Sequence, residues 1–161
     1  MPIIHCMSGY IGFGKTTCAK KLAEKYHAKR LTPDEVMINL YGTDVDSDFL
    51  KKAEQVNEYI WQEIEKYITD GQDVIFDTGP WGRADRKYIL DRASKLNASV
   101  IWHQMECRVE TARQRTLERA KENGELFVDE AFFDENLKKY TPITEDEHLT
   151  VVYHKGESST M

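Results

Sequence analysis

The chain has 161 residues, of which 40% are hydrophobic and 31% are charged, and its formal net charge at pH 7 is −6. This composition predicts one globular domain over residues 1–153 with a frayed tail at 154–161, and the acidic balance argues against a broad basic surface for nucleic acid. The apolar runs are too short to cross a bilayer and no signal sequence is recognisable, so we expect a cytoplasmic protein without a membrane partner.

The glycine-rich segment 9–16 reads G-x-x-x-x-G-K-T. An apolar run at 3–7 predicts a buried strand before it, and apolar residues at helical spacing within 19–26 predict a helix after it. This order is typical of a phosphate-binding loop, because backbone N–H groups and the helix dipole then face one anion. In such a loop Lys15 reaches the β- and γ-phosphates and the Thr16 hydroxyl is a ligand of Mg²⁺. The predicted nucleotide contacts are Gly9, Gly12, Phe13, Gly14, Lys15, Thr16 and Thr17.

A second strand is expected at 28–31, followed by a helix that starts with Thr32 as cap and Pro33 in its first position. Asp34 lies in the first turn of that helix, and two roles are open for it. The carboxylate can simply stabilise the helix dipole. It can also face the phosphates, because residues just beyond the ends of parallel strands converge on the ligand crevice.

A long helix is predicted at 47–70, and a buried strand at 73–77 follows it and ends in Asp77. An apolar strand with a terminal aspartate resembles a Walker B strand, whose carboxylate holds the magnesium shell, so Asp77 is a predicted metal ligand. Thr78 stands where motor and transporter ATPases usually have a glutamate, and the sequence lacks an N-K-x-D guanine motif. Both features point away from motors and GTPase switches.

The loop at 78–82 is rich in turn residues and should lie at the same edge of the sheet. We expect its Trp81 to be available for substrate binding, with simple packing as the alternative. Arg83 and Arg86 begin the next predicted helix. Basic side chains in a first helical turn oppose the dipole, which favours an anion or a carboxylate as their partner.

A helix is predicted at 109–123, and Arg108, Arg115 and Arg119 align on one stripe because they are separated by seven and four residues. One interpretation is a phosphate-facing stripe. The other is a solvated surface, since a glutamate follows Arg115 and Arg119 three residues later in each case.

The alternation of strands and helices predicts an α/β domain with a mainly parallel sheet and helices on both faces. A short helix is expected within 128–140. The five predicted strands are at 3–7, 28–31, 73–77, 99–105 and 149–153.

Together these motifs resemble the small P-loop kinase-like ATPases of the AAA-domain type, a group that includes polynucleotide kinase, chloramphenicol phosphotransferase, gluconate kinase and zeta-toxin domains. The resemblance is carried by the loop at 9–16, by 31–35, and by 77–81 with Arg86, and it covers about residues 3–153. The ending at 127–147 is similar to a bacterial subgroup. The resemblance implies the P-loop NTPase three-layer sandwich with a five-stranded sheet and a helical lid at about 108–127.

The resemblance also implies roles for the matching residues. Asp34 matches the general base that acts on the acceptor hydroxyl, and Asp77 matches the acidic residue near metal and acceptor. Arg115 and Arg119 match lid arginines that close over the transferring phosphate, and are catalytic candidates with Lys15 and Asp34. The candidate acceptor contacts are Asp34, Asp77, Trp81 and Arg86.

The implied activity is transfer of the γ-phosphoryl group from ATP·Mg²⁺ to a hydroxyl of a small-molecule acceptor, by a monomer or homodimer. Two alternatives stay open. One is a nucleotide-binding regulatory ATPase without an acceptor, and the other is a polynucleotide 5′-hydroxyl kinase, against which the acidic charge argues. The chain departs from the family pattern at Ile11 and Phe13. Phosphate binding needs only the backbone N–H groups of the loop, so these departures affect the implied acceptor more than the implied phosphate binding.

Overall fold

The computed structural model describes residues 2–41, 49–78, 82–124 and 129–155. One parallel sheet has the strand order β2-β3-β1-β4-β5. Its strands are β1 (Ile3–Ser8), β2 (Lys29–Leu31), β3 (Val74–Phe76), β4 (Ser99–Glu106) and β5 (Val151–Lys155). The helices are α1 (Lys15–Tyr26), α2 (Pro33–Tyr41), α3 (Phe49–Thr69), α4 (Arg83–Lys95), α5 (Val109–Glu122), α6 (Glu130–Leu137) and the short 3₁₀ helix η1 (Glu145–Glu147).

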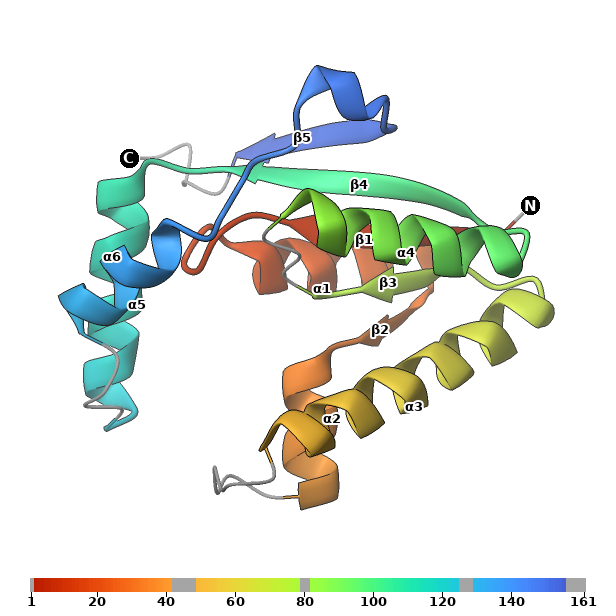
Figure 1. Cartoon of the computed structure of the whole chain (residues 1–161), viewed down its shortest axis with the longest axis horizontal. Coiled ribbons are helices and arrows are strands. Elements are labelled where there is room, and N and C mark those ends of the chain that lie inside the picture. Colours follow the sequence, from red (N-terminus) through yellow and green to blue (C-terminus); the bar gives the residue numbers. More distant parts are fainter. Residues whose placement is uncertain (1, 42–48, 79–81, 125–128, 156–161) are drawn as a thin grey trace.

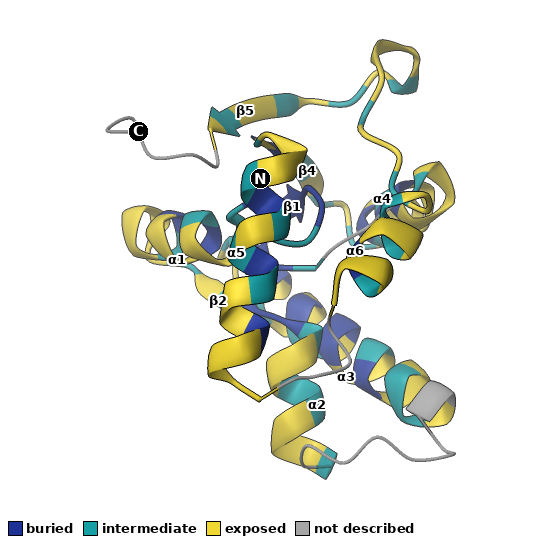
Figure 2. Cartoon of the chain, turned by 90° about the vertical axis from the view of Figure 1, so that its left-hand side faces the viewer, coloured by how far each residue is buried: buried dark blue, intermediate teal, exposed yellow. Residues whose placement is uncertain are grey.

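Two hydrophobic layers sandwich the sheet. On one face, Ile4 and Cys6 of β1 pack with the apolar stripes of α3 and α4, where Trp61 is the largest buried side chain. On the other face, Met7 of β1 and Ile75 of β3 pack against α1. Figure 1 shows α5 and α6 standing together at one end of this sandwich. Buried residues follow the inner sides of the helices, while β5 at the sheet edge is largely exposed (Figure 2).

The predicted three-layer α/β fold is confirmed, and the sheet is parallel throughout. One boundary prediction was wrong. The tail does not begin at residue 154, because His154 and Lys155 belong to β5 and pair with Met105 and Glu106 of β4. The apolar pattern could not predict that these last two residues belong to the strand, because both are polar; backbone pairing with β4 holds them, and His154 also contacts His103. No helix in the described part of the chain is long and apolar enough to span a membrane.

A row of three histidines crosses the sheet from β1 to β5. His5 Nδ1 lies 2.9 Å from His103 Nε2, and His103 Nδ1 lies 2.8 Å from His154 Nε2. The other nitrogen of His5 is 3.7 Å from Asp73, whose second oxygen accepts the Ile3 amide at 2.8 Å. Burial, together with the neighbouring imidazoles, lowers the pKa of His103 to about 4.

This row predicts a loss of stability in mild acid. The pKa of His103 is lower in the folded state than its unfolded value of about 6.5, so its contribution is complete above about pH 6.5 and declines as the pH falls toward 4. At pH 5.5 the loss from His103 should be about 1.4 kcal/mol. Urea unfolding at pH 7.5 and 5.5 should show wild type losing about that much more stability than His103→Gln; equal losses would contradict the assignment.

Candidate active site

The segment between β1 and α1 has the conformation of a phosphate-binding loop. Gly12 and Gly14 have φ angles of 79° and 93°, which favour glycine. Gly14 is the N-cap of α1 and provides no side chain to cap the helix. The first N–H groups of α1, from Lys15 to Thr17, therefore have no acceptor within the helix and can bind an anion.

The loop lies directly against α5 at Gly12. A Cβ atom on Gly12 would lie 2.5 Å from the carbonyl oxygen of Ala112 and 2.7 Å from Thr116 Oγ1. The Thr116 hydroxyl is itself bonded to the Ala112 carbonyl at 2.8 Å, so neither atom can move away easily. Only glycine fits this contact, which places α5 next to the loop.

An aromatic cluster anchors the other side of the loop to α6. Tyr10 is fully buried, its hydroxyl donates to the carbonyl of Phe133 at 2.6 Å, and its ring packs edge-on against Phe13 and Phe133. Phe13 also contacts Tyr140. The Phe13 amide donates to the Tyr10 carbonyl at 3.1 Å. Both the side chain and the amide of Phe13 are thus engaged within the protein, and its predicted contact with the nucleotide stays a prediction.

Lys15 is mostly enclosed within the loop, and its ammonium donates to the Gly9 carbonyl at 2.7 Å. Burial lowers the pKa of Lys15 to about 8, although the nearby carboxylates of Asp77 and Asp34 act to raise it. Arg119 of α5 is close enough to lower it again. The loop lysine is therefore surrounded by the predicted carboxylates and by one predicted arginine.

Asp77 directly follows β3 and is almost fully buried. Its amide donates to the Leu31 carbonyl at 2.8 Å, which ties it to the end of β2. Burial raises the pKa of the Asp77 carboxyl, while Arg30, Lys15 and the Thr16 hydroxyl act in the opposite direction. The two predicted metal-binding residues are thus brought together.

Hydroxyl and carboxylate oxygens side by side are the hard donors that Mg²⁺ prefers. Thr16 and Asp77 therefore fit Mg²⁺ as two protein ligands, with nucleotide phosphates supplying others.

Arg30 is a site residue that the sequence did not reveal. Its Nη1 donates to Asp77 at 3.0 Å and its Nη2 to Glu35 at 2.5 Å. The residue was hidden because its partner Asp77 is 47 positions away in the chain. A basic residue at the end of a strand leading into the crevice was the available signal.

Asp34 is exposed in the first turn of α2. It lies just beyond β2, at the same sheet edge as the phosphate-binding loop after β1, and its charge acts to raise the pKa of Lys15. The location agrees with the predicted convergence of strand ends, and leaves the carboxylate available to an acceptor.

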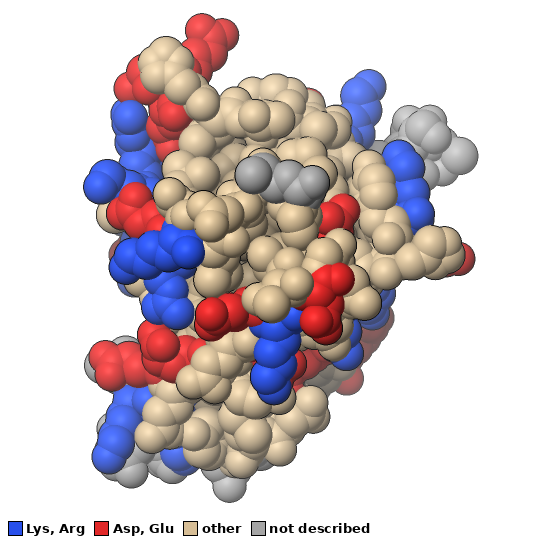
Figure 3. Space-filling model, turned by 90° about the vertical axis from the view of Figure 1, so that its right-hand side faces the viewer, with Lys and Arg blue, Asp and Glu red and all other residues tan. Residues whose placement is uncertain are grey.

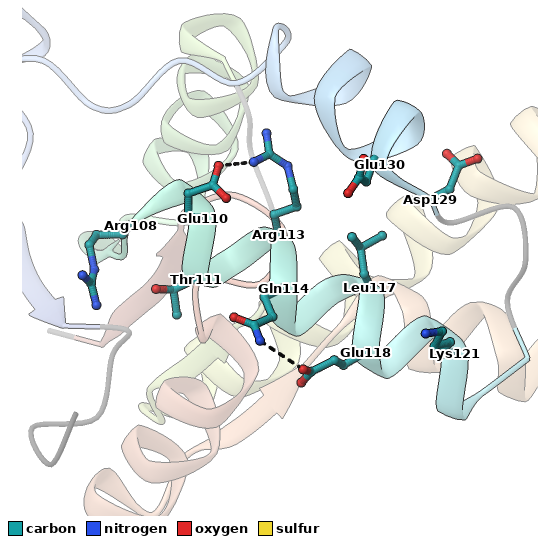
Figure 4. A pocket seen from close by; sticks show the side chains of 10 residues that line it. All are labelled: Arg108, Glu110, Thr111, Arg113, Gln114, Leu117, Glu118, Lys121, Asp129 and Glu130. Carbon is teal, nitrogen blue, oxygen red and sulfur yellow. Dashed lines mark hydrogen bonds and ion pairs between the residues drawn. The ribbon is translucent and has the colours of Figure 1, made fainter.

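Two of the three aligned arginines face the loop. Arg115 Nη1 lies 3.5 Å from the Gly12 carbonyl, and Arg119 acts electrostatically on Lys15. Arg108 instead lines a groove of about 710 Å³ along α5 and α6, and none of the groove's lining residues belongs to the phosphate-binding loop (Figure 4). There Arg113 is paired with Glu110. The stripe therefore divides between two surfaces of α5.

Arg86 does not lie at a substrate surface, and its predicted acceptor contact is corrected. The side chain is fully buried, and its Nε and Nη2 donate to Glu147 at 2.7 and 2.9 Å. Its Nη1 donates to the Thr141 carbonyl at 2.9 Å. The expected carboxylate partner is present, but it belongs to the segment before β5. Trp81 lies outside the described residues, so its role stays a prediction.

The fold and the loop geometry define a P-loop nucleotide-binding protein of the kinase-like type. A family model described as an AAA domain matches residues 4–143, and the chain belongs to this family. The predicted relation to the P-loop kinase-like group is thereby confirmed. No curated protein shows significant sequence similarity to the chain.

Several solved structures share the fold. A provisionally assigned kinase from Chloroflexus aurantiacus J-10-fl has a TM-score of 0.74 and 15% identity, over 96% of this chain and 88% of that one. Kti12 of Chaetomium thermophilum, in complex with ADP-AlF3, has a TM-score of 0.67 and 18% identity, over 94% and 89%. A gluconokinase from Sinorhizobium meliloti 1021 has a TM-score of 0.61 and 11% identity, over 98% and 83%. At these identities the likeness concerns the fold.

The lowered pKa of Lys15 predicts pH-dependent nucleotide binding. Phosphate binding needs the ammonium form, so ADP affinity should decline above about pH 8 and be roughly tenfold weaker at pH 9 than at pH 7. Calorimetric titrations across this range would measure it. Lys15→Ala is the control and should bind weakly with little pH dependence. A wild-type profile as flat as that of the variant would exclude Lys15 as the titrating group.

Proposed function

We propose that this protein is a kinase that transfers the γ-phosphoryl group of ATP to a hydroxyl group of a small molecule. The observation that carries the proposal is the position of Asp34. The exposed carboxylate starts α2 just beyond β2, at the sheet edge where the phosphate-binding loop follows β1, and its charge acts on the loop lysine, so it is a candidate base at the edge where the nucleotide phosphates would bind. A general base in this position suits phosphoryl transfer to an alcohol better than transfer to water alone.

The chain's residues divide the work of the reaction between them. The amides of Gly14 to Thr17 and the Lys15 ammonium bind and orient the phosphates. Asp34 accepts the proton of the acceptor hydroxyl as the oxygen attacks phosphorus. Arg115 and Arg119 neutralise charge on the transferred group, with α5 and α6 serving as the lid. Mg²⁺, which Thr16 and Asp77 would hold, would supply further neutralisation of the phosphate charge.

Two observations support a small acceptor. The gluconokinase of similar fold acts on a sugar acid by its printed name, and its length resembles that of this chain. The formal net charge of the chain is −6, and on the molecular face drawn in Figure 3, which is turned away from α5 and the phosphate-binding loop, acidic and basic side chains intermix. A polynucleotide would be better served by a basic track along the binding face.

Thermal unfolding with nucleotides and a panel of hydroxyl compounds tests the proposal. ATP·Mg²⁺ should raise the midpoint of wild type but not of Lys15→Ala, and one acceptor should raise it further. No shift with any nucleotide would refute a nucleotide site. If nucleotide raises the midpoint but no acceptor changes the rate of ATP hydrolysis, the regulatory ATPase is favoured. Salt-sensitive binding of an oligonucleotide would favour the polynucleotide kinase.

Replacing the proposed base should separate binding from chemistry. Asp34→Asn should bind ATP·Mg²⁺ nearly as wild type does, while transfer to the acceptor found above slows by roughly 10²–10⁴-fold because the proton acceptor is lost. Transfer of labelled phosphate measures the rate. Asp91→Asn, an exposed aspartate on α4, is the control and should keep the wild-type rate. Full transfer by Asp34→Asn would show that another group is the base.

A further inference from the structure

Arg30 connects two carboxylates on different elements. One guanidinium nitrogen is 3.0 Å from Asp77 at the end of β3, and the other is 2.5 Å from Glu35 in the first turn of α2. The side chains of Arg30 and Asp77 are only 15% and 5% exposed, whereas that of Glu35 is 57% exposed. The arginine therefore has one enclosed contact beside the loop and one open contact on the helix that carries Asp34.

The enclosed contact uses the carboxylate that fits Mg²⁺. Arg30 bonds Asp77 Oδ2, and the hydroxyl of Thr16, the other fitting ligand, acts to lower the pKa of the same carboxyl group. A nearly buried carboxylate needs a counter-charge, because an unpaired buried ion is costly. Here Arg30 supplies it, with Lys15 close by. A divalent cation on Asp77 would supply it instead, and would repel a guanidinium at hydrogen-bonding distance.

We infer that Arg30 and Mg²⁺ compete for Asp77, and that Arg30 is a positioning residue that links metal binding to α2. Without metal, the guanidinium holds Asp77 and Glu35 together, which fixes the start of α2 against β3. Metal binding loosens the Asp77 contact and leaves Arg30 paired with Glu35, beside Asp34. The inference rests on the proposed function, because it takes Asp77 as a ligand of nucleotide-bound Mg²⁺.

A purely structural ion pair would behave differently. Removing its arginine would lower the stability of the protein, and the dependence of nucleotide binding on Mg²⁺ would stay the same. Competition instead predicts that removing Arg30 makes the metal bind more tightly, because Asp77 is then left without its closest counter-charge. Metal affinity distinguishes the two cases, and it can be measured without an acceptor or turnover.

The test measures ADP affinity at a series of fixed free Mg²⁺ concentrations, beginning in chelator. The free Mg²⁺ concentration that gives half of the metal-dependent gain should fall by about tenfold in Arg30→Gln, equivalent to about 1.4 kcal/mol. Affinity for ADP in chelator should be nearly unchanged. Arg92→Gln is the matched control, since Arg92 on α4 also pairs with a carboxylate of another helix, Glu58, far along the chain. It should follow wild type.

Arg30→Lys separates charge from geometry. Lysine keeps the positive charge but cannot bridge two carboxylates with a planar fork. The half-point, meaning the free Mg²⁺ concentration that gives half of the metal-dependent gain in ADP affinity, should therefore lie between those of wild type and Arg30→Gln. An unchanged or higher half-point in Arg30→Gln overturns the inference. A lysine variant identical to wild type also overturns it, because net charge alone would then explain the effect.

A measurement on the wild-type protein covers the case in which Arg30→Gln does not fold. The guanidinium N–H resonance of Arg30, assigned by its loss in Arg30→Lys, should shift when Mg²⁺ is added to the ADP complex. A resonance that stays in place overturns the inference. Absence of ADP binding by wild type would overturn the proposed function as well, whereas ADP binding with an unaltered metal response in the variants overturns the inference alone.

Discussion

The contact between Gly12 and α5 is the constraint on which the site depends. The loop backbone approaches Ala112 and Thr116 so closely that a single methyl group would not fit. Helix α5 is therefore seated on the phosphate-binding loop, and Arg115 Nη1 lies 3.5 Å from the Gly12 carbonyl. The contact at Ala112 and Thr116 thus fixes against the loop the turns of α5 that precede Arg119.

The parallel sheet explains why scattered residues meet at this point. Every strand ends at the same edge, so Asp77 after β3 and Asp34 after β2 are delivered to the loop that follows β1. Burial and charge then act together on Lys15. The aromatic packing of Tyr10 and Phe13 anchors the opposite side of the loop to α6.

Local signals in the sequence were enough for most of the fold and for the core of the site. The glycine loop, each apolar strand and the aspartate that ends β3 are motifs that span only a few residues each, so a local sequence pattern identifies them. Partners of charged residues leave no such signature. Arg86 finds Glu147 across 61 positions, and Arg30 finds Asp77 across 47. Sequence could therefore predict that Arg86 needs an anion, but not that this anion is structural.

The central position of β1 has a consequence for the order in which the protein can fold. Strand β1 pairs with β3 and β4, and its contacts join residues as far apart as 70 and 98 positions. Such long loops must close before β1 has any neighbour in the sheet, which slows folding. The phosphate-binding loop directly after β1 therefore gains its support from the sheet only once β4 has been synthesised, and a nascent chain that ends before β4 lacks that support.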